Sequence, residues 1–156
     1  MSFVSRIAVP LLLAVGLYGQ QQPLPYSHKT HLALGLKCNA CHKNPDPGEV
    51  MGFPPEAFCM SCHRSIKADS QHIRRLAAAA KEKKPIQWVR VYQIPSFVYF
   101  GHRVHLDAGA KCETCHGPVR ERDVITKEVS LNMRFCMGCH TETKARNDCN
   151  ACHEER

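Results

Sequence analysis

The chain has 156 residues and a formal net charge of +7, and it contains ten cysteines and ten histidines. A chain of this length forms one compact unit rather than several domains. A positive net charge is typical of proteins that bind nucleic acid or a membrane. It does not by itself identify either partner, because bound groups can change the net charge.

The N-terminal segment has the layout of a secretory signal peptide. Arg6 precedes an apolar run from Ile7 to Leu17, a small-x-small site lies at Ala14-Val15-Gly16, and polar glutamines follow. The run is too short to cross a bilayer comfortably, so residues 1–19 are predicted to be a cleaved signal, with an uncleaved membrane anchor as the alternative. No cysteine lies near the cleavage region, which excludes a lipoprotein anchor.

The sequence Cys-x-x-Cys-His occurs five times and uses every cysteine. We number these motifs one to five in chain order: Cys38, Cys41 and His42; Cys59, Cys62 and His63; Cys112, Cys115 and His116; Cys136, Cys139 and His140; Cys149, Cys152 and His153. In c-type haem attachment the two thiols add to the haem vinyl groups and the histidine becomes the proximal iron ligand. Zinc knuckles and a disulfide framework explain the cysteines but not the five histidines. Five covalently bound haem c groups are therefore predicted.

The motifs are arranged in a tandem repeat. His28-x-x-His31 stands ten residues before Cys38, and His102-x-x-His105 stands ten residues before Cys112. This predicts a dihaem module with a trailing helix at 20–84, an extended connector at 85–100, a second dihaem module at 101–143 and a C-terminal haem segment at 144–156. The predicted fold class is mainly α with much irregular loop, in which stacked haems form the core because so short a chain cannot bury five haems separately.

Two elements are predicted between the modules. Residues 69–84 read as a helix that Asp69 or Ser70 caps and Pro85 ends, with an apolar face of Ile73, Leu76, Ala77 and Ala80. Residues 86–100 are rich in β-branched and aromatic side chains, and Pro95 favours an extended course. The aromatic side chains of this segment are expected to fill a core between modules, or alternatively to line haem faces or dock a partner.

Five histidines remain once the proximal ones are assigned. The paired positions of His28, His31, His102 and His105 predict four distal iron ligands, whereas His72 lies in a polar stretch and reads as a surface residue. Met133 and Met51 are candidates for the remaining iron, where a Met/His pair would raise the reduction potential. Irons with both axial positions filled relay electrons and offer no site for substrate, so no catalytic residue and no small-molecule substrate are expected.

The cofactors change the meaning of the positive charge. Each ferric haem with two propionates adds about one negative charge, so five haems cancel most of the +7. The basic residues are therefore read as partners of propionates, and nucleic acid is not an expected partner. A local run at Lys81-Glu82-Lys83-Lys84 reads as a solvated helix end, or as a contact for a partner or anionic lipid.

The His-x-x-His and Cys-x-x-Cys-His arrangement resembles class III multihaem cytochromes c. Over residues 24–153 the chain is most similar to the pentahaem cytochrome c subunit of alternative complex III, a bacterial quinol-oxidising complex. The stretches that carry this likeness are Ser27 to His31, Gly52-Phe53-Pro54, Cys59 to His63, Lys84 to Val91, Pro95 to Phe100, Cys115-His116-Gly117 and Leu131-Asn132-Met133. That family tends to carry histidine where this chain has Met51 and near the position of Tyr92; a Met51 that replaces a ligating histidine would raise the potential of the second haem.

The resemblance implies a respiratory subunit on the periplasmic face of the inner membrane. It would accept electrons from an iron–sulfur subunit and pass them towards a cytochrome or oxidase. A free periplasmic shuttle that feeds a terminal reductase is the alternative function. A multihaem reductase enzyme is less favoured, because all five motifs end in histidine.

Overall fold

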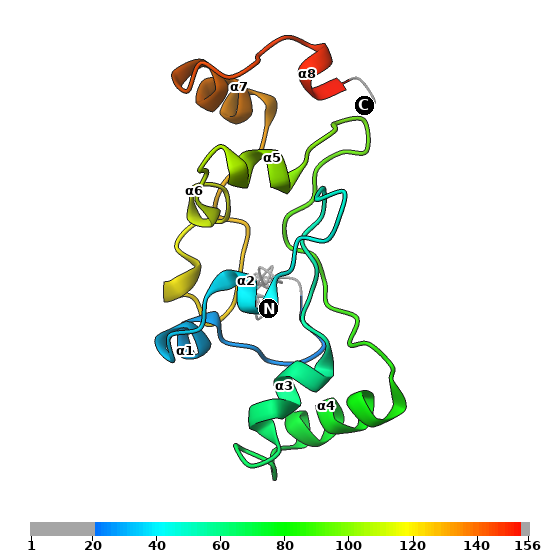
Figure 1. The fold of residues 1–156 in the computed structure, drawn as a ribbon. Coiled ribbons are helices and arrows are strands. Elements are labelled where there is room, and N and C mark those ends of the chain that lie inside the picture. Colours follow the sequence, from blue (N-terminus) through cyan, green and yellow to red (C-terminus); the bar gives the residue numbers. More distant parts are fainter. Residues whose placement is uncertain (1–20, 154–156) are drawn as a thin grey trace, which may run out of the picture.

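The computed structural model describes residues 21–153 and shows an elongated arrangement of short helices joined by irregular segments (Figure 1). The helices are α1 (His28–Ala33), α2 (Cys38–Cys41), α3 (Glu56–His63), α4 (Gln71–Glu82), α5 (His102–Asp107), α6 (Cys112–His116), the 3-10 helix η1 (Val119–Glu121), α7 (Met133–Glu142) and α8 (Asn150–His153). No strand occurs within this range, which confirms the predicted helical and loop-rich class. The signal-peptide prediction for 1–19 and the last residues of the C-terminal segment lie outside the described range.

The helices lie along the long axis in an order that differs from chain order. Figure 1 shows α3 and α4 at the lower end, then α1 and α2, then α5 and α6, and finally α7 and α8 at the upper end. The helix that carries motif two is therefore terminal, although this motif comes second in the sequence. Within the described residues, no helix is long and apolar enough to cross a bilayer.

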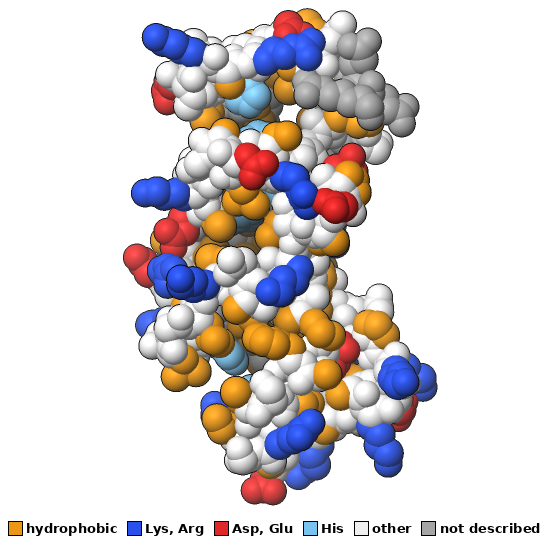
Figure 2. Space-filling view, viewed as in Figure 1, with side chains coloured by type: hydrophobic (Ala, Val, Ile, Leu, Met, Phe, Trp, Pro, Cys, Tyr) orange, Lys and Arg blue, Asp and Glu red, His pale blue; other side chains and the backbone are white. Residues whose placement is uncertain are grey.

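The described chain has almost no protein core. Only two of its hydrophobic residues are buried, Leu24 at 5% and Leu76 at 6% exposure, whereas many large apolar side chains are open to solvent. Figure 2 shows hydrophobic side chains along the middle of the molecule, with histidines visible in the openings between them. A chain with this little apolar burial needs another source of packing to hold one conformation.

The predicted connector helix is confirmed, with ends two residues inside the predicted ones. Ser70 caps α4 by accepting a hydrogen bond from the His72 backbone N–H, and Lys83 ends it in the left-handed conformation at φ 55°. Leu76 is buried, and α4 packs on α3 along this apolar face. The segment from 86 to 100 forms no helix, as predicted, and turns once where the Val98 N–H donates to the Pro95 carbonyl at 3.0 Å.

Two reciprocal contacts join the first and second halves. The Arg103 N–H donates to the Gly48 carbonyl at 2.9 Å, and the Arg103 guanidinium reaches Asp46 at 2.7 Å. In the opposite direction, the Lys29 N–H donates to the Arg122 carbonyl at 3.0 Å. A loop that follows the first motif of each half thus binds the helix that opens the other half.

Candidate functional site

Each motif lies on a helix, and the helices fall into two kinds. Motifs one and three form the short helices α2 and α6, while motifs two and four lie in the longer α3 and α7, and motif five forms all of α8. All ten cysteines are free thiols, and all are half-buried or exposed. The helical turn places both thiols and the histidine of a motif on neighbouring positions of one turn. Within residues 21–153, no three or more His, Cys, Asp or Glu side chains converge on a metal-ion site.

Four motif histidines each face one histidine from a His-x-x-His pair. The ring centres are 6.3 Å apart for His28 and His42, 6.1 Å for His31 and His63, 6.4 Å for His102 and His116, and 6.0 Å for His105 and His140. The planes of the first and third pairs are nearly parallel, at 9° and 6°, while the other two are tilted by 53° and 46°. Equivalent pairs in the two halves therefore have equivalent geometry.

These spacings fit a metal ion between the two rings. Each imidazole centre lies about 1.1 Å behind its nitrogen and a metal–nitrogen bond is about 2 Å long, so two rings on opposite sides of one ion are about 6 Å apart. Direct ring stacking would bring aromatic centres closer, as between Tyr26 and His31 at 4.4 Å. The four histidine pairs thus fit the two axial positions of a haem iron, and the adjacent thiols fit its vinyl groups.

Backbone carbonyls orient most of these histidines. Nδ1 lies within hydrogen-bonding distance of a carbonyl oxygen in His31 (Ser27, 2.8 Å), His42 (Gly52, 2.9 Å), His63 (Ile66, 3.0 Å), His102 (Glu49, 2.7 Å), His105 (Gly101, 2.8 Å), His140 (Arg146, 2.6 Å) and His153 (Phe97, 3.1 Å). A carbonyl only accepts, so Nδ1 carries the proton and Nε2 presents its lone pair. The chain therefore prepares these rings for ligation through Nε2.

The remaining two paired histidines are kept neutral by burial. Burial, followed by the neighbouring His42 and His31, lowers the pKa of His28 to about 4, and its Nδ1 is buried without a hydrogen-bond partner. Burial also lowers the pKa of His116, and His102 and His42 lower it further. A neutral imidazole is the form that binds a metal ion, so both environments favour ligation.

Aromatic side chains pack on the histidine pairs in a repeated way. Tyr26 stacks on His31 at 4.4 Å and meets His28 edge-on at 4.8 Å. Phe100 stacks on His105 at 4.4 Å and meets His102 edge-on at 4.9 Å. Each ring therefore fixes the orientation of both histidines of its pair.

The connector aromatics lie beside motif histidines. Trp88, Tyr92 and Phe100 are half-buried, while Phe97 and Tyr99 are exposed. Tyr92 meets His116 edge-on at 4.7 Å, and Phe97 lies 6.0 Å from His153. These two contacts fit the alternative that the connector aromatics line haem faces, and core filling between the modules stays a prediction.

The thiols of neighbouring motifs lie close enough to raise one another's pKa, in a single series. Burial and then Cys41 raise the pKa of Cys59, while burial and then Cys38, which is hydrogen-bonded to it, raise the pKa of Cys112. Burial raises the pKa of Cys115 and Cys136 as well, followed by the thiols of the fourth motif for Cys115 and by Cys152 of the fifth for Cys136. These neighbours place the motifs in the spatial order two, one, three, four, five.

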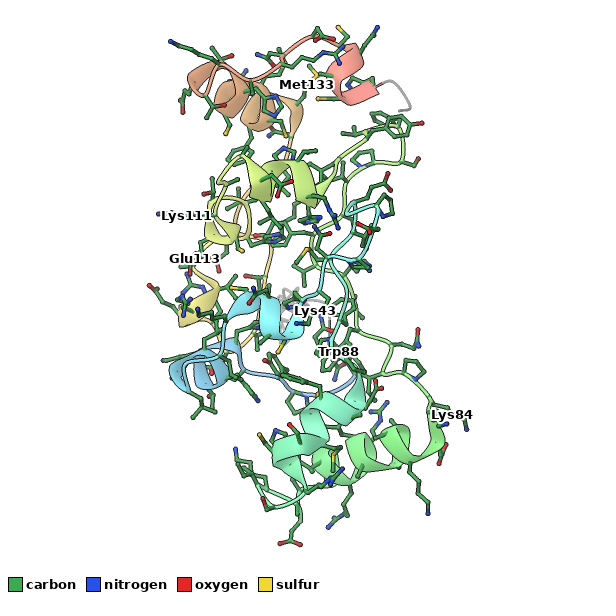
Figure 3. All side chains as sticks on the ribbon, in the orientation of Figure 1. Lys43, Lys84, Trp88, Lys111, Glu113 and Met133 are labelled. Atoms are coloured by element: carbon green, nitrogen blue, oxygen red, sulfur yellow. The ribbon has the colours of Figure 1, made fainter. Side chains whose placement is uncertain are left out.

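The fifth motif differs from the others. Among the described residues, no histidine ring faces His153. Its Nδ1 forms a hydrogen bond with the Phe97 carbonyl. Met133 begins α7, is 67% exposed and lies between α7 and α8 in Figure 3, near this motif. Met51 precedes Gly52, whose carbonyl binds His42, so its backbone lies beside the first motif instead. His72 is exposed on α4, as predicted for a surface residue.

Comparison with known proteins agrees with this site. Residues 98–154 match the family model for cytochrome c7 and related cytochrome c. The fold and the site agree with this likeness to multihaem cytochromes c, which are electron-transfer proteins with covalently bound haem c.

The chain is also similar to a small part of a much longer protein. Over 84 residues, 54% of this chain, the sequence is 33% identical to the histidine biosynthesis trifunctional protein of Neurospora crassa. The chain spans only 9% of the length of that protein.

Sequence reasoning missed two groups of residues. One is Tyr26, although aligning the two repeats sets Tyr26-Ser27-His28 beside Phe100-Gly101-His102 and gives a detectable signal. The other is the set of carbonyl acceptors, such as Glu49, which binds a histidine 53 residues away. A backbone carbonyl leaves no trace in side-chain identity, so no sequence signal was available for it.

Proposed function

We propose that this chain is a periplasmic pentahaem cytochrome c that relays electrons as a subunit of a membrane quinol-oxidising respiratory complex. The single observation that carries the relay is the set of four histidine pairs with ring centres 6.0–6.4 Å apart. Haem c bound at the motifs supplies reversible one-electron chemistry. The paired cysteines would attach it, and the paired histidines would hold its iron and so keep substrate away from it.

In this proposal the axial pairs are His28 with His42, His31 with His63, His102 with His116 and His105 with His140. The fifth motif takes His153 with Met133, because Met133 is the methionine beside α8 and Met51 is not. The other four irons carry two histidines, so a methionine at the fifth gives that end of the molecule a higher potential. At equilibrium an electron would therefore reside at the fifth site more often than at the other four.

The spatial series of motifs supports a relay with two ends. Each motif has thiol neighbours in the next motif of the series, so the attachment sites are close together throughout. The second motif forms one end and the fifth forms the other. Haems held at these sites would form a continuous path between the two ends, which supports a role between two redox partners.

The complex, its location and its partners rest on the resemblance and on the connector. The segment from 86 to 100 contacts both halves. The Gln22 side chain exchanges two hydrogen bonds with the Val89 backbone, at 2.9 and 3.0 Å, and the Glu128 N–H donates to the Tyr92 hydroxyl at 3.1 Å. The exposed residues of this segment, including Phe97 and Tyr99, leave surface for an iron–sulfur partner subunit or a cytochrome or oxidase. A free periplasmic shuttle is the second candidate, and the absence of a spanning helix among the described residues is compatible with either function.

Low-temperature EPR and optical spectra of the purified holoprotein test the relay. We expect low-spin signals from five haems and no reaction with cyanide or nitrite. A high-spin component that binds either ligand would instead favour a reductase. Co-purification with an iron–sulfur subunit and a polytopic membrane subunit tests the complex, and recovery only as a periplasmic monomer would favour the shuttle.

A further inference from the structure

The lower end of the molecule carries a concentration of positive charge. Residues 64–84 contain seven cations and two carboxylates, a net +5, and all seven cations are exposed. Residues 133–153, a segment of the same length at the other end, contain three cations and two carboxylates, a net +1. Figure 2 shows the Lys and Arg side chains around α3 and α4. One haem at the lower end and two haems at the upper end would each subtract about one charge, so the asymmetry between the ends remains.

Several of these cations are fixed in place. The Arg74 guanidinium donates to the Asp69 carbonyl at 2.6 Å, and that of Arg75 donates to the Pro23 carbonyl at 2.8 Å. Lys84 pairs with Glu82 at 2.9 Å and lies at the lower edge in Figure 3. Cations held by backbone contacts lose little side-chain entropy when they meet a partner.

An exposed apolar residue belongs to the same basic segment. Ile66 is 53% exposed between Arg64 and Lys67, and its carbonyl holds Nδ1 of His63 at 3.0 Å. His63 is the histidine of the second motif, which is the terminal motif in the spatial series. A partner that covers Ile66 would therefore lie one hydrogen bond from a ligand of the terminal iron.

From these observations we propose that Ile66 and the cations of residues 64–84 together form the docking surface for an acidic redox protein. This inference rests on the proposed relay function, in which the second motif is one end. Opposite charge speeds the encounter and orients it, and an apolar centre with a charged rim is the usual anatomy of a transient interface.

A membrane surface fits this region less well. A helix that lies in a bilayer interface inserts an apolar face into the lipid. The apolar face of α4 is already used, because Leu76 is 6% exposed and α4 packs on α3. The face that α4 leaves open is polar, which suits an acidic protein.

Isothermal titration calorimetry of the oxidised holoprotein with an oxidised acidic flavodoxin tests the surface without electron transfer. The probing variant is Lys81→Glu/Lys83→Glu, and the matched control is Arg134→Glu/Lys144→Glu. Each pair changes the same charge, and each includes one helical lysine or arginine and one residue in the left-handed conformation, Lys83 at φ 55° or Lys144 at φ 57°. A third variant, Ile66→Asn, removes the apolar centre without changing charge or the carbonyl.

We expect the α4 variant to weaken binding about tenfold at low ionic strength, with the difference lost at high salt. Ile66→Asn should weaken binding at both salt concentrations, and the control should change it less than about twofold. Equal losses in the two double variants would mean that only net charge matters and would overturn the proposal, as would no binding by the wild type. Binding to phosphatidylglycerol vesicles that α4 controls, with flavodoxin unaffected, would overturn it in favour of a membrane.

Failure of this surface is distinguishable from failure of the relay. If the variants bind normally while the holoprotein still shows low-spin haems that dithionite reduces, only the docking surface is wrong. If the holoprotein shows high-spin haems that bind cyanide, the relay itself is wrong.

Discussion

At the scale of single residues, the structure brings together the histidines that the sequence singled out, and their role as iron ligands stays a prediction. The ten-residue step from His-x-x-His to Cys-x-x-Cys-His identified His28, His31, His102 and His105 as candidates. It could not pair them with motifs, because each pair of histidines serves two motifs. The structure supplies the pairing, since the first histidine of each pair faces the nearer motif and the second faces the longer helix.

Replacing one distal histidine should change one haem only. In His105→Ala the ring 6.0 Å from His140 is lost, so the iron of the fourth motif should become high-spin and bind cyanide. EPR and optical titration should show one high-spin haem and four low-spin haems. The control His72→Ala changes an exposed histidine and should leave all five low-spin; an unchanged His105→Ala spectrum would contradict the pairing.

Met133 gives a second residue-scale prediction. Met133→Ala should remove the red charge-transfer band that a thioether-ligated ferric haem shows, and should lower the potential of that haem if histidine or water replaces sulfur. Absorption spectra and a redox titration measure both effects. Met137→Ala, which changes another partly exposed methionine of α7, should leave the band in place. If Met51→Ala abolishes the band instead, the assignment of Met133 is wrong.

At the scale of elements, the connector acts through Tyr92. Its hydroxyl accepts from the Glu128 and Val129 N–H groups at 3.1 and 3.3 Å and lies 3.4 Å from the His116 carbonyl. Tyr92→Phe leaves those N–H groups without this acceptor and should cost about 1 to 3 kcal/mol. Thermal unfolding of the holoprotein measures the loss. Tyr99→Phe, on a ring that is 44% exposed, should cost much less; equal effects would mean that the hydroxyl contacts of Tyr92 are not stabilising.

The loop at Gly48 tests how the two halves are joined. A Cβ at Gly48 would lie 2.5 Å from Arg103 Nε and 2.6 Å from Arg103 Cβ, and Gly48 also has φ +91°. Gly48→Ala should therefore cost more than Gly35→Ala, because Gly35 has a similar φ of +84° but nothing within 4 Å of the new Cβ. We expect a difference of about 1 to 3 kcal/mol in unfolding free energy. Equal costs would show that Arg103 moves aside and that the contact is soft.

Local signals predicted elements well and long-range contacts poorly. Ser70, the apolar positions of 73–80 and Pro85 predicted α4 to within two residues at each end, because caps and helical periodicity are local. The same sequence could not predict that Gly48 meets Arg103 or that Cys38 meets Cys112. Those contacts depend on how the halves pack, and that packing involves side chains far apart in the chain.

At the scale of the whole molecule, the chain depends on its cofactor for a core. With only Leu24 and Leu76 buried among the described hydrophobic residues, the chain without haem should not unfold cooperatively. Circular dichroism of protein produced without haem attachment should show a broad thermal change, while the holoprotein should show a sharp transition at higher temperature. A sharp transition in both forms would mean that the polypeptide folds on its own.

The reciprocal contacts between the halves have a consequence for direction. Arg103 binds Gly48 as Lys29 binds Arg122, and Cys38 meets Cys112, its own equivalent. These are the contacts of a pseudo-twofold axis, like those between identical subunits of a dimer. The four sites of the two halves are then equivalent on either side of that axis, so they do not by themselves favour transfer one way. Direction must come from what breaks the symmetry: the fifth motif at one end and the basic helix α4 at the other.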